Sequence, residues 1–339
     1  MRNQSAAGIL IVGLGAVAES HVRALEHLPD AEVTAGVDTD RSRQLYFRGT
    51  SRPVYPSVRE ASKAHTPAAV VIATPTPSHA AVCAEVAAYL PHARVLVEKP
   101  AAATLTEAQR VLSGAETHHS VDVAYHMAFS PEVAWGAEAV RIRQPRLGDL
   151  ETAELFFADP YYDDYDHAAA TLCNSWLDSG INALSVLSRF AMVTGRRSLR
   201  NLGTERQSTF EAQLTCQQGT TQAEALIVTN WHVTDASKTT RLKYASGAQL
   251  LMDHTAVAAY LYQNGTVEAY FGADRSIPRR ERHYRALYQW WLIEGNPTFP
   301  ATVSRNLHEL LLDSLMSHQR PLSGEARCHA VTSRPPFPT

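Results

Sequence analysis

The sequence predicts an α/β protein of two domains, in which a doubly wound parallel sheet precedes an α+β domain with a large, mostly antiparallel open sheet. Three observations predict it. The length of 339 residues accommodates two domains. Residues 8–125 alternate continuous apolar strands with Ala-rich helical segments, which is typical of a parallel sheet covered on both faces. After about residue 148, alternating strands are separated by turn signals, which indicates antiparallel hairpins.

Composition excludes several classes of partner. Hydrophobic content of 45%, charged content of 19% and a net charge of −3 are ordinary for a globular protein, so we expect no nucleic acid or membrane partner. The four cysteines are scattered without a CxxC pair, which argues against both a metal site and a disulfide framework. The apolar run "GILIVGLG" is too short for a signal or a membrane span. We therefore expect a cytoplasmic protein without a metal.

The first strand, "ILIVGLG", continues into the pattern Gly13-x-Gly15-x-x-Ala18 and then into a helix. Gly13 allows the tight turn, Gly15 lets the backbone approach a pyrophosphate, and Ala18 lets the helix lie close to the sheet. The helix N-terminus supplies amide donors for the phosphates, at Ala16 and Val17. The pattern predicts dinucleotide binding.

An acidic residue follows the second strand, "EVTAGVD". Asp38 stands twenty residues after Ala18, where a carboxylate can bind the ribose hydroxyls. Such a carboxylate repels a 2′-phosphate, so it favours NAD. Arg41 and Arg43 leave NADP open, although ordinary surface charge is the simpler interpretation of both.

The third and fourth strands end in polar residues at the edge where such sheets bind ligands. In "ATPTPSH", Thr74 and Pro75 leave the strand and His79 starts a helix; alone, this histidine is more typical of packing or capping. In "VEKP", Glu98 and Lys99 precede a proline that can be cis. Lys99 is placed to meet the nicotinamide and to transfer a proton, and a solvated lysine is the alternative.

Strands in the second half are predicted at 150–158, within 208–233 and within 241–272. Turns are expected at Gln218-Gly219, Ser246-Gly247 and Asn264-Gly265.

Two helical segments follow, at 280–295 and 303–319, and the last residues read as a loose tail. We therefore expect a dinucleotide-binding domain at 1–125, a substrate-binding and oligomerisation domain at 126–320 whose last helices return toward the first, and a tail at 321–339.

The stretch "SWLDSGINALSVLSRF", residues 175–190, places Asp178 and Asn182 four residues apart on one helical face, among core residues. A buried carboxylate is costly unless it is paired. The alternative is a helix start, in which Asp178 is the cap, Gly180 permits a tight entry and Asn182 faces solvent.

The segments "GLGAVAESH", "ATPTPSH", "VEKP" and "LDSGIN", in this order, resemble the glucose-fructose oxidoreductase/inositol dehydrogenase/MocA family. The resemblance implies a Rossmann domain that holds NAD(P), a second domain that forms the substrate wall, and a homo-oligomer, either a dimer or a tetramer. The family's EKP lysine falls on Lys99. Its Asp-x-Gly-x-His segment falls on Asp178, Gly180 and Asn182. The acid/base histidine of most members is therefore replaced by the amide of Asn182, and Lys99 must take a larger part in proton transfer.

Within that family, "SGINALSVL" is similar to L-arabinose and D-galactose 1-dehydrogenases, which oxidise a pyranose C1 hydroxyl to a lactone. The segments "VAYHMAF" and "TNWHV" also have counterparts there. They imply that His126 and Trp231 belong to the substrate pocket, with ordinary core positions as the alternative.

The other wall of the pocket is expected in "ADPYYDDYDHAAATL". Its tyrosines, carboxylates and histidine, among them Tyr161, Asp163 and His167, suit a polyhydroxylated or basic substrate. The loop departs from the Gly-rich segment of the family, which puts a simple free sugar in doubt. A solvated acidic loop is the alternative.

The expected function is hydride transfer between NAD(P) and a carbinol or carbonyl carbon of a sugar-like small molecule. Lys99 would exchange the proton with the hydroxyl, Asp178 would orient Lys99, and Asn182 would hold the substrate oxygen. Two alternatives are an imine or ketone reductase for an amine-bearing or nucleoside-like substrate, and a non-catalytic sugar or cofactor sensor.

Overall fold

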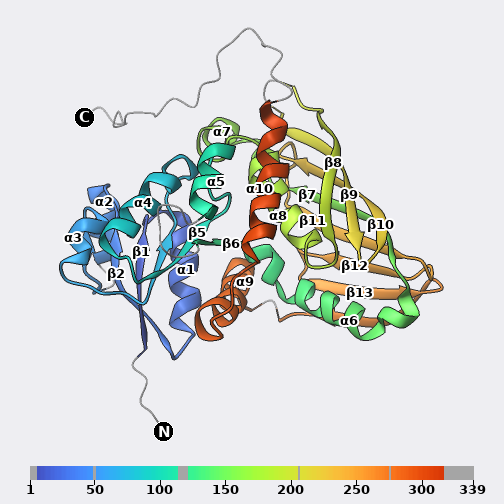
Figure 1. Cartoon of the computed structure of the whole chain (residues 1–339), viewed down its shortest axis with the longest axis horizontal. Helices are drawn as coiled ribbons and strands as arrows, with labels where there is room; N and C mark the ends of the chain where they lie inside the picture. Colours follow the sequence, from blue (N-terminus) through green and yellow to red (C-terminus); the bar gives the residue numbers. More distant parts are fainter. Residues whose placement is uncertain (1–5, 49–50, 114–120, 205–206, 275, 317–339) are drawn as a thin grey trace.

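The first layer of the computed structural model is a six-stranded parallel sheet in the order β3-β2-β1-β4-β5-β6 (Figure 1). The structure describes residues 6–48, 51–113, 121–204, 207–274 and 276–316. The strands of this sheet are β1 (Ala7–Val12), β2 (Ala31–Val37), β3 (Val54–Tyr55), β4 (Ala69–Ile72), β5 (Arg94–Glu98) and β6 (Val121–Ala124). Its helices are α1 (Ala16–Glu26), α2 (Arg41–Arg48), α3 (Val58–Ser62), η1 (Thr76–Ser78), α4 (His79–Tyr89) and α5 (Leu105–Ser113).

The order of these strands explains their apolar sequences. Residues 9–12 of β1 and 69–72 of β4 are buried at every position, because neighbouring strands and the helices enclose them. The chain order reverses between β1 and β4, and ligands of such sheets bind at the carboxyl ends of the strands beside this point. The predicted doubly wound sheet is confirmed.

The second layer is an eight-stranded sheet in the order β14-β13-β12-β11-β7-β10-β9-β8. Only β7 and β10 pair in parallel within it. The predicted turns carry glycines with positive φ at 219, 247 and 265. The strands are β7 (Leu150–Ala158), β8 (Met192–Asn201), β9 (Thr209–Gln218), β10 (Thr221–Asn230), β11 (Ser237–Tyr244), β12 (Gln249–Asp253), β13 (Ala258–Gln263) and β14 (Thr266–Gly272).

Strand β8 was not predicted from the sequence. It is rich in arginine and its pairing with β9 shifts register twice, at 193–195 and 196–198, which removes the simple alternation of apolar and polar residues.

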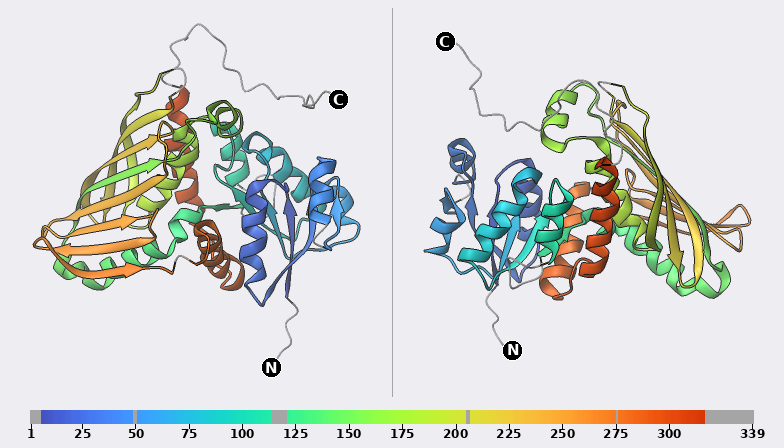
Figure 2. Two further views of the ribbon diagram at one scale, coloured as in Figure 1. Left: turned by 180° about the vertical axis from the view of Figure 1, so that it is seen from behind. Right: turned by 45° about the horizontal axis from the view of Figure 1, so that its top comes forward.

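Helices lie between the two sheets, and one face of the second sheet carries none in the described part of the chain (Figure 2). Helix α9 packs against α1, and α10 packs against α5. The expected dimer or tetramer stays a prediction, and the tail expected at 321–339 lies outside the described residues. The elements are η2 (His126–Phe129), α6 (Pro131–Leu147), α7 (Tyr165–Leu172), the π-helical turn η3 (Trp176–Gly180), α8 (Ile181–Leu187), α9 (Arg279–Tyr288), the π-helical turn η4 (Gln289–Ile293) and α10 (Ala301–Met316).

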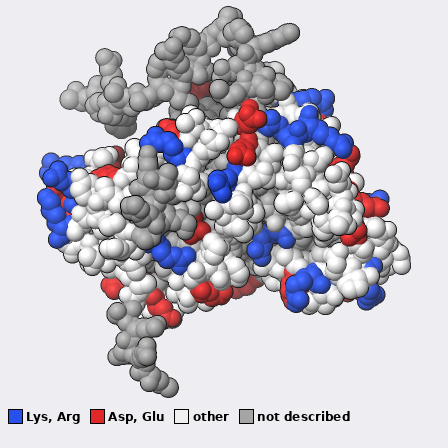
Figure 3. Space-filling model, viewed as in Figure 1, with Lys and Arg blue, Asp and Glu red and all other residues white. Residues whose placement is uncertain are grey.

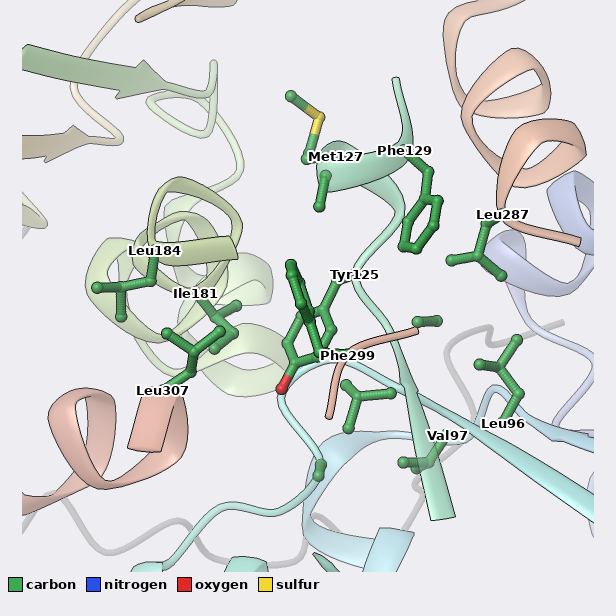
Figure 4. Close-up of a cluster of buried hydrophobic side chains, with 14 of the residues drawn as sticks. Leu96, Val97, Tyr125, Met127, Phe129, Ile181, Leu184, Leu287, Phe299 and Leu307 are labelled. Atoms are coloured by element: carbon green, nitrogen blue, oxygen red, sulfur yellow. The ribbon is translucent and has the colours of Figure 1, made fainter. Parts of the chain in front are cut away.

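A buried apolar cluster joins the two halves (Figure 4). Tyr125, directly after β6, packs its ring edge-on against Phe299, with centroids 5.3 Å apart. Val97 of β5, Ile181 of α8 and Leu307 of α10 belong to the same core. This packing holds α8 near the carboxyl ends of β5 and β6.

Lysine and arginine are interspersed with aspartate and glutamate on the face drawn in Figure 3. Across the ranges that the structure describes, no helix combines the length and apolar character needed to cross a bilayer.

The turn after β1 generates a prediction about stability. Gly13 has a φ of +91°, and a Cβ there would lie 2.6 Å from the backbone nitrogen of Thr74. Gly13→Ala should therefore lower the free energy of unfolding by about 1–3 kcal/mol, measured by urea denaturation. Gly272→Ala is the matched control, since a Cβ there meets nothing within 4 Å. Equal stability of the two variants would contradict the prediction.

Candidate active site

A cavity of about 260 Å³ opens at the carboxyl ends of the strands of the first sheet and reaches across to the second. It collects most of the residues predicted from the sequence. Those that line it are Gly15, Ala16, Val17, Thr74, Pro75, His79, Glu98, Lys99, His126, Tyr161, Asp178 and Asn182. Five predicted residues do not line it: Gly13, Asp38, Asp163, His167 and Trp231.

The cofactor end of the cavity fits a dinucleotide. A Cβ on Gly15 would meet nothing nearer than 3.9 Å, so the backbone leaves room beside the first turn of α1. Among the described residues, no side chain caps this turn, which leaves its amides for an anion. The buried Thr74 Oγ1 has no hydrogen-bond partner in the described structure. These groups would hold the diphosphate and the adjoining ribose of NAD.

Asp38 lies directly after β2 and is buried at the entrance to this region. Its two carboxylate oxygens accept the N–H groups of Leu14 and Asp40, each at 2.8 Å, so each oxygen keeps a free lone pair. The guanidinium of Arg43 stands 3.8 Å from the carboxylates of both Asp38 and Asp40. Arg43 also lines the cavity, although its side chain is 49% exposed.

His79 ties two loops together at the rim. Its ring nitrogens lie 2.8 Å from the carbonyl oxygen of Thr74 and 3.0 Å from that of Pro100. The peptide between Lys99 and Pro100 is cis. Burial lowers the pKa of His79, and the contacts with the two carbonyl oxygens oppose that shift. The ring thus joins the ends of β4 and β5.

Glu98 joins β5 to two helices. Its Oε1 accepts hydrogen bonds from Tyr284 at 2.6 Å and from His21 Nε2 at 3.0 Å, and its Oε2 accepts the N–H of Lys99 at 3.2 Å. Burial alone would raise the pKa of Glu98, but the hydrogen bonds and the charge of His21, with Tyr284, hold it below the ordinary value. The carboxylate thus fixes the start of the loop that carries Lys99.

Lys99 and Asp178 form a largely buried ion pair. The ammonium lies 2.6 Å from Asp178 Oδ1 and also donates to the carbonyl oxygen of Asp178 at 3.0 Å. Their side chains are only 12% and 10% exposed, so solvent competes little for these bonds. An ammonium has three N–H groups, and the third is left for the cavity.

The segment around Asp178 is a π-helical turn that continues into α8. Gly180 has a helical φ of −63°, and a Cβ there would lie 2.7 Å from the ring of Trp176, so packing explains this glycine. Asn182 is buried and donates from Nδ2 to the carbonyl oxygen of Asp178 at 3.2 Å. The helix-start interpretation, with Asn182 in solvent, is therefore wrong.

The amide oxygen of Asn182 has no hydrogen-bond partner in the described structure, although it is buried and the residue lines the cavity. A buried acceptor without a partner costs about 1–3 kcal/mol, and a hydroxyl on a ligand would remove that cost.

A second buried ion pair stands beside the first. Lys238 of β11 lies 2.7 Å from Asp159, and Ser179 donates to the other oxygen of Asp159 at 2.6 Å. Burial would raise the pKa of Asp159, but the charge of Lys238 holds it below the ordinary value. Ser179 follows Asp178 in the chain, so the two ion pairs are adjacent.

His126 is a buried neutral residue at the floor of the cavity. Its ring stacks on that of His283 at 5.6 Å, with the two Nδ1 atoms 3.3 Å apart. Burial, followed by the neighbouring charge of His283, lowers its pKa well below the ordinary value. His126 therefore offers hydrogen bonds and not charge.

The tyrosine-rich loop contributes less than its sequence indicated. Tyr161 lines the cavity and packs edge-on against Trp231, with centroids 5.1 Å apart. Trp231 is itself buried behind that ring. Asp163 and His167 are exposed and do not line the cavity. The solvated-loop interpretation holds for these two side chains.

Sequence reasoning missed several polar residues of the site, namely His21, Lys238, Arg279 and Arg280, and it did not single out Asp159 within the loop that it predicted to line the pocket. For two of them a signal was present. Lys238 is in phase with the buried Thr240, Leu242 and Tyr244 of β11, so the period of two places its side chain inside. Asp159 directly follows the end of β7. For the others, only the packing of distant segments reveals their place.

Within the described ranges, no group of three or more metal-ligating side chains occurs.

Residues 7–126 match the model of the GFO_IDH_MocA family, described as an oxidoreductase family with an NAD-binding Rossmann fold. A relative is the rhizopine catabolism protein MocA of Rhizobium meliloti, 30% identical over 148 residues. That alignment covers 43% of this chain and 45% of the relative, so it spans less than half of either protein.

Solved structures share the fold of almost the whole chain. An oxidoreductase from Agrobacterium radiobacter, in complex with NAD+, L-tartaric acid and magnesium, has a TM-score of 0.77 at 14% identity over 93% of this chain and 98% of its own. UDP-N-acetylglucosamine 3-dehydrogenase from Acidithiobacillus ferrooxidans has a TM-score of 0.73 at 17% identity, over 93% and 98%. Residues 7–126 thus match the NAD-binding Rossmann domain of the Gfo/Idh/MocA oxidoreductase family, and the solved structures share the fold of almost the whole chain.

Proposed function

We propose that this chain is an NAD(P)-dependent dehydrogenase or reductase that acts on a carbinol or carbonyl carbon of a sugar-like molecule. The observation that carries the proposal is the ammonium of Lys99, which is held by Asp178 in the same cavity as the first turn of α1. When bound, the nicotinamide supplies the acceptor or donor of hydride.

The residues of the chain handle the proton and the substrate oxygen. In oxidation, Lys99 as a free amine takes the hydroxyl proton, and in reduction its ammonium returns one. Asp178 fixes the position of the lysine through two contacts, to its side-chain and backbone oxygens. Asn182 Oδ1, which has no partner in the described structure, accepts the hydrogen of a neighbouring substrate hydroxyl, since the hydrogen of the reacting hydroxyl goes to Lys99.

The charges of the cavity do not favour an amine-bearing substrate. Its three lining carboxylates, Glu98, Asp159 and Asp178, already accept bonds from the protein. Because a donor of the protein already offsets each of these charges, their attraction for an ammonium group is weakened. A non-catalytic sensor would have no use for a proton-transfer lysine, and a test of turnover separates the two.

The first prediction of this subsection concerns Lys99. Lys99→Met should lower turnover by about 10²- to 10⁴-fold and leave NAD(H) affinity within about three-fold, because it removes only the proton carrier. Steady-state kinetics and a fluorescence titration of NADH measure the two effects. Lys63→Met, at an exposed lysine, is the control. Unchanged turnover in Lys99→Met would place the role elsewhere, and no turnover in either protein would favour a sensor.

The second prediction concerns the cofactor. Because the free lone pairs of Asp38 suit ribose hydroxyls and repel a 2′-phosphate, NAD(H) should bind more tightly than NADP(H). Asp38→Ala should narrow the difference between the two dissociation constants. Asp40→Ala, which removes an exposed carboxylate of the same loop, should leave it nearly unchanged. Tighter binding of NADP(H) to the unmutated protein would contradict this and point to Arg43.

The third prediction concerns Asp178 and Asn182. Asp178→Asn should reduce turnover while the fold persists, because Lys99 loses the charge that positions it. Asn182→Ala should mainly raise KM, since it deletes a hydrogen bond worth about 0.5–1.5 kcal/mol. Melting temperatures and steady-state kinetics on both variants test this. A lower melting temperature with normal kinetics in both would show that the two residues serve only the fold.

A further inference from the structure

The lining of the cavity has more cationic side chains than its carboxylates can pair. Asp178 is paired with Lys99 and Asp159 with Lys238, while Glu98 is bonded to a buried histidine and a tyrosine. Each of these three carboxylates therefore already has a partner within the protein. The cations that remain belong to the start of α9.

Arg279 and Arg280 both line the cavity, and neither makes an ion pair with a carboxylate of the described residues. Arg279 is half-buried, and burial lowers the pKa of its guanidinium. The negative charge of Asp159 acts in the opposite direction, but Asp159 is already paired with Lys238. A partly desolvated guanidinium without its own anion is costly. An anionic group of a ligand would remove that cost.

Both arginines stand at the substrate end of the cavity. Arg280 lies beside Tyr161, which follows β7 of the second sheet: burial raises the pKa of the Tyr161 hydroxyl, and Arg280 opposes that rise. The charges that act most on Arg279 include Asp159, which directly follows β7 of the second sheet, and Glu132 of α6. The dinucleotide phosphates belong to the opposite end, at the first turn of α1. The first backbone N–H groups of α9 add to the positive potential, since no side chain caps them in the described structure.

We propose that the substrate carries an oxyanion group, a carboxylate or a phosphate monoester, which Arg279 and Arg280 bind while Lys99 meets the reacting carbon. A guanidinium presents paired N–H donors that match either oxyanion in a bidentate manner. The inference rests on the proposed oxidoreductase function and narrows its substrate class from sugars in general to sugar acids or sugar phosphates.

The first test compares matched substrates in the presence of NAD+. An aldose, its uronate and its terminal phosphate differ only in the group remote from C1. We expect kcat/KM at least about 10-fold higher for the uronate or the phosphate ester than for the aldose, since hydrogen bonds to charged groups carry that much discrimination. Whichever of the uronate and the phosphate ester has the higher kcat/KM identifies the oxyanion. An aldose turned over as well as both anions overturns this inference but leaves the proposed function standing. No turnover of any of the three counts against both.

The second test removes each charge. Arg279→Gln and Arg280→Gln should lower kcat/KM for the anionic substrate by about 10- to 100-fold and change that for the aldose by less than about three-fold. Arg280→Lys should give a kcat/KM for the anionic substrate between those of the unmutated protein and Arg280→Gln, because an ammonium keeps the charge but not the paired N–H donors of a guanidinium. Arg241→Gln, on the exposed face of β11, is the matched control. NADH affinity should stay unchanged in all of them. Equal losses on both substrates, or a loss of NADH affinity instead, would overturn the proposal.

Discussion

The site depends on the ion pair between Lys99 and Asp178. The lysine comes from the end of β5 in the first sheet and the aspartate from the π-helical turn before α8 in the second half. A pair with so little solvent is favourable only when its geometry is good and its remaining hydrogen-bonding groups are satisfied. Two contacts from one ammonium to one residue meet that condition. The pair consequently requires the two halves of the chain to keep one relative position.

Several buried contacts keep that position. Glu98 receives hydrogen bonds from α1 and α9 and holds the backbone of Lys99. On the other side, Trp176 occupies the space above Gly180, and its indole donates to the carbonyl oxygen of Leu311 on α10. The apolar cluster around Tyr125 fills the volume between them (Figure 4). Polar and apolar packing thus converge on a lysine that could otherwise sample many rotamers.

The neighbouring ion pair of Asp159 and Lys238 extends this arrangement, because Ser179 connects it to the segment of Asp178. Most charges in the cavity are thereby neutralised within the protein. Among the described residues that line the cavity, the amide oxygen of Asn182 and the hydroxyl of Thr74 have no hydrogen-bond partner, and the two guanidinium groups at the start of α9 have no ion pair. The contacts of a ligand with these few groups contribute to its free energy of binding. Asn182 and Thr74 offer neutral polar atoms, and the arginines of α9 offer positive charge.

The sequence by itself determined the parallel sheet, the turn at Gly13 and Gly15, the acid at Asp38 and the placement of Lys99, because each depends on a local pattern of strand, turn and helix. The hairpins of the second sheet followed from the same local chemistry at their turns. Only the tertiary structure decided the partners of each charge. The acidic loop drew attention through composition, yet Asp163 and His167 face solvent, while Lys238 and Arg279 enter the cavity from segments some 40 residues apart. Burial of a charge depends on contacts between strands and helices distant in the chain, and no local pattern records which of them will meet.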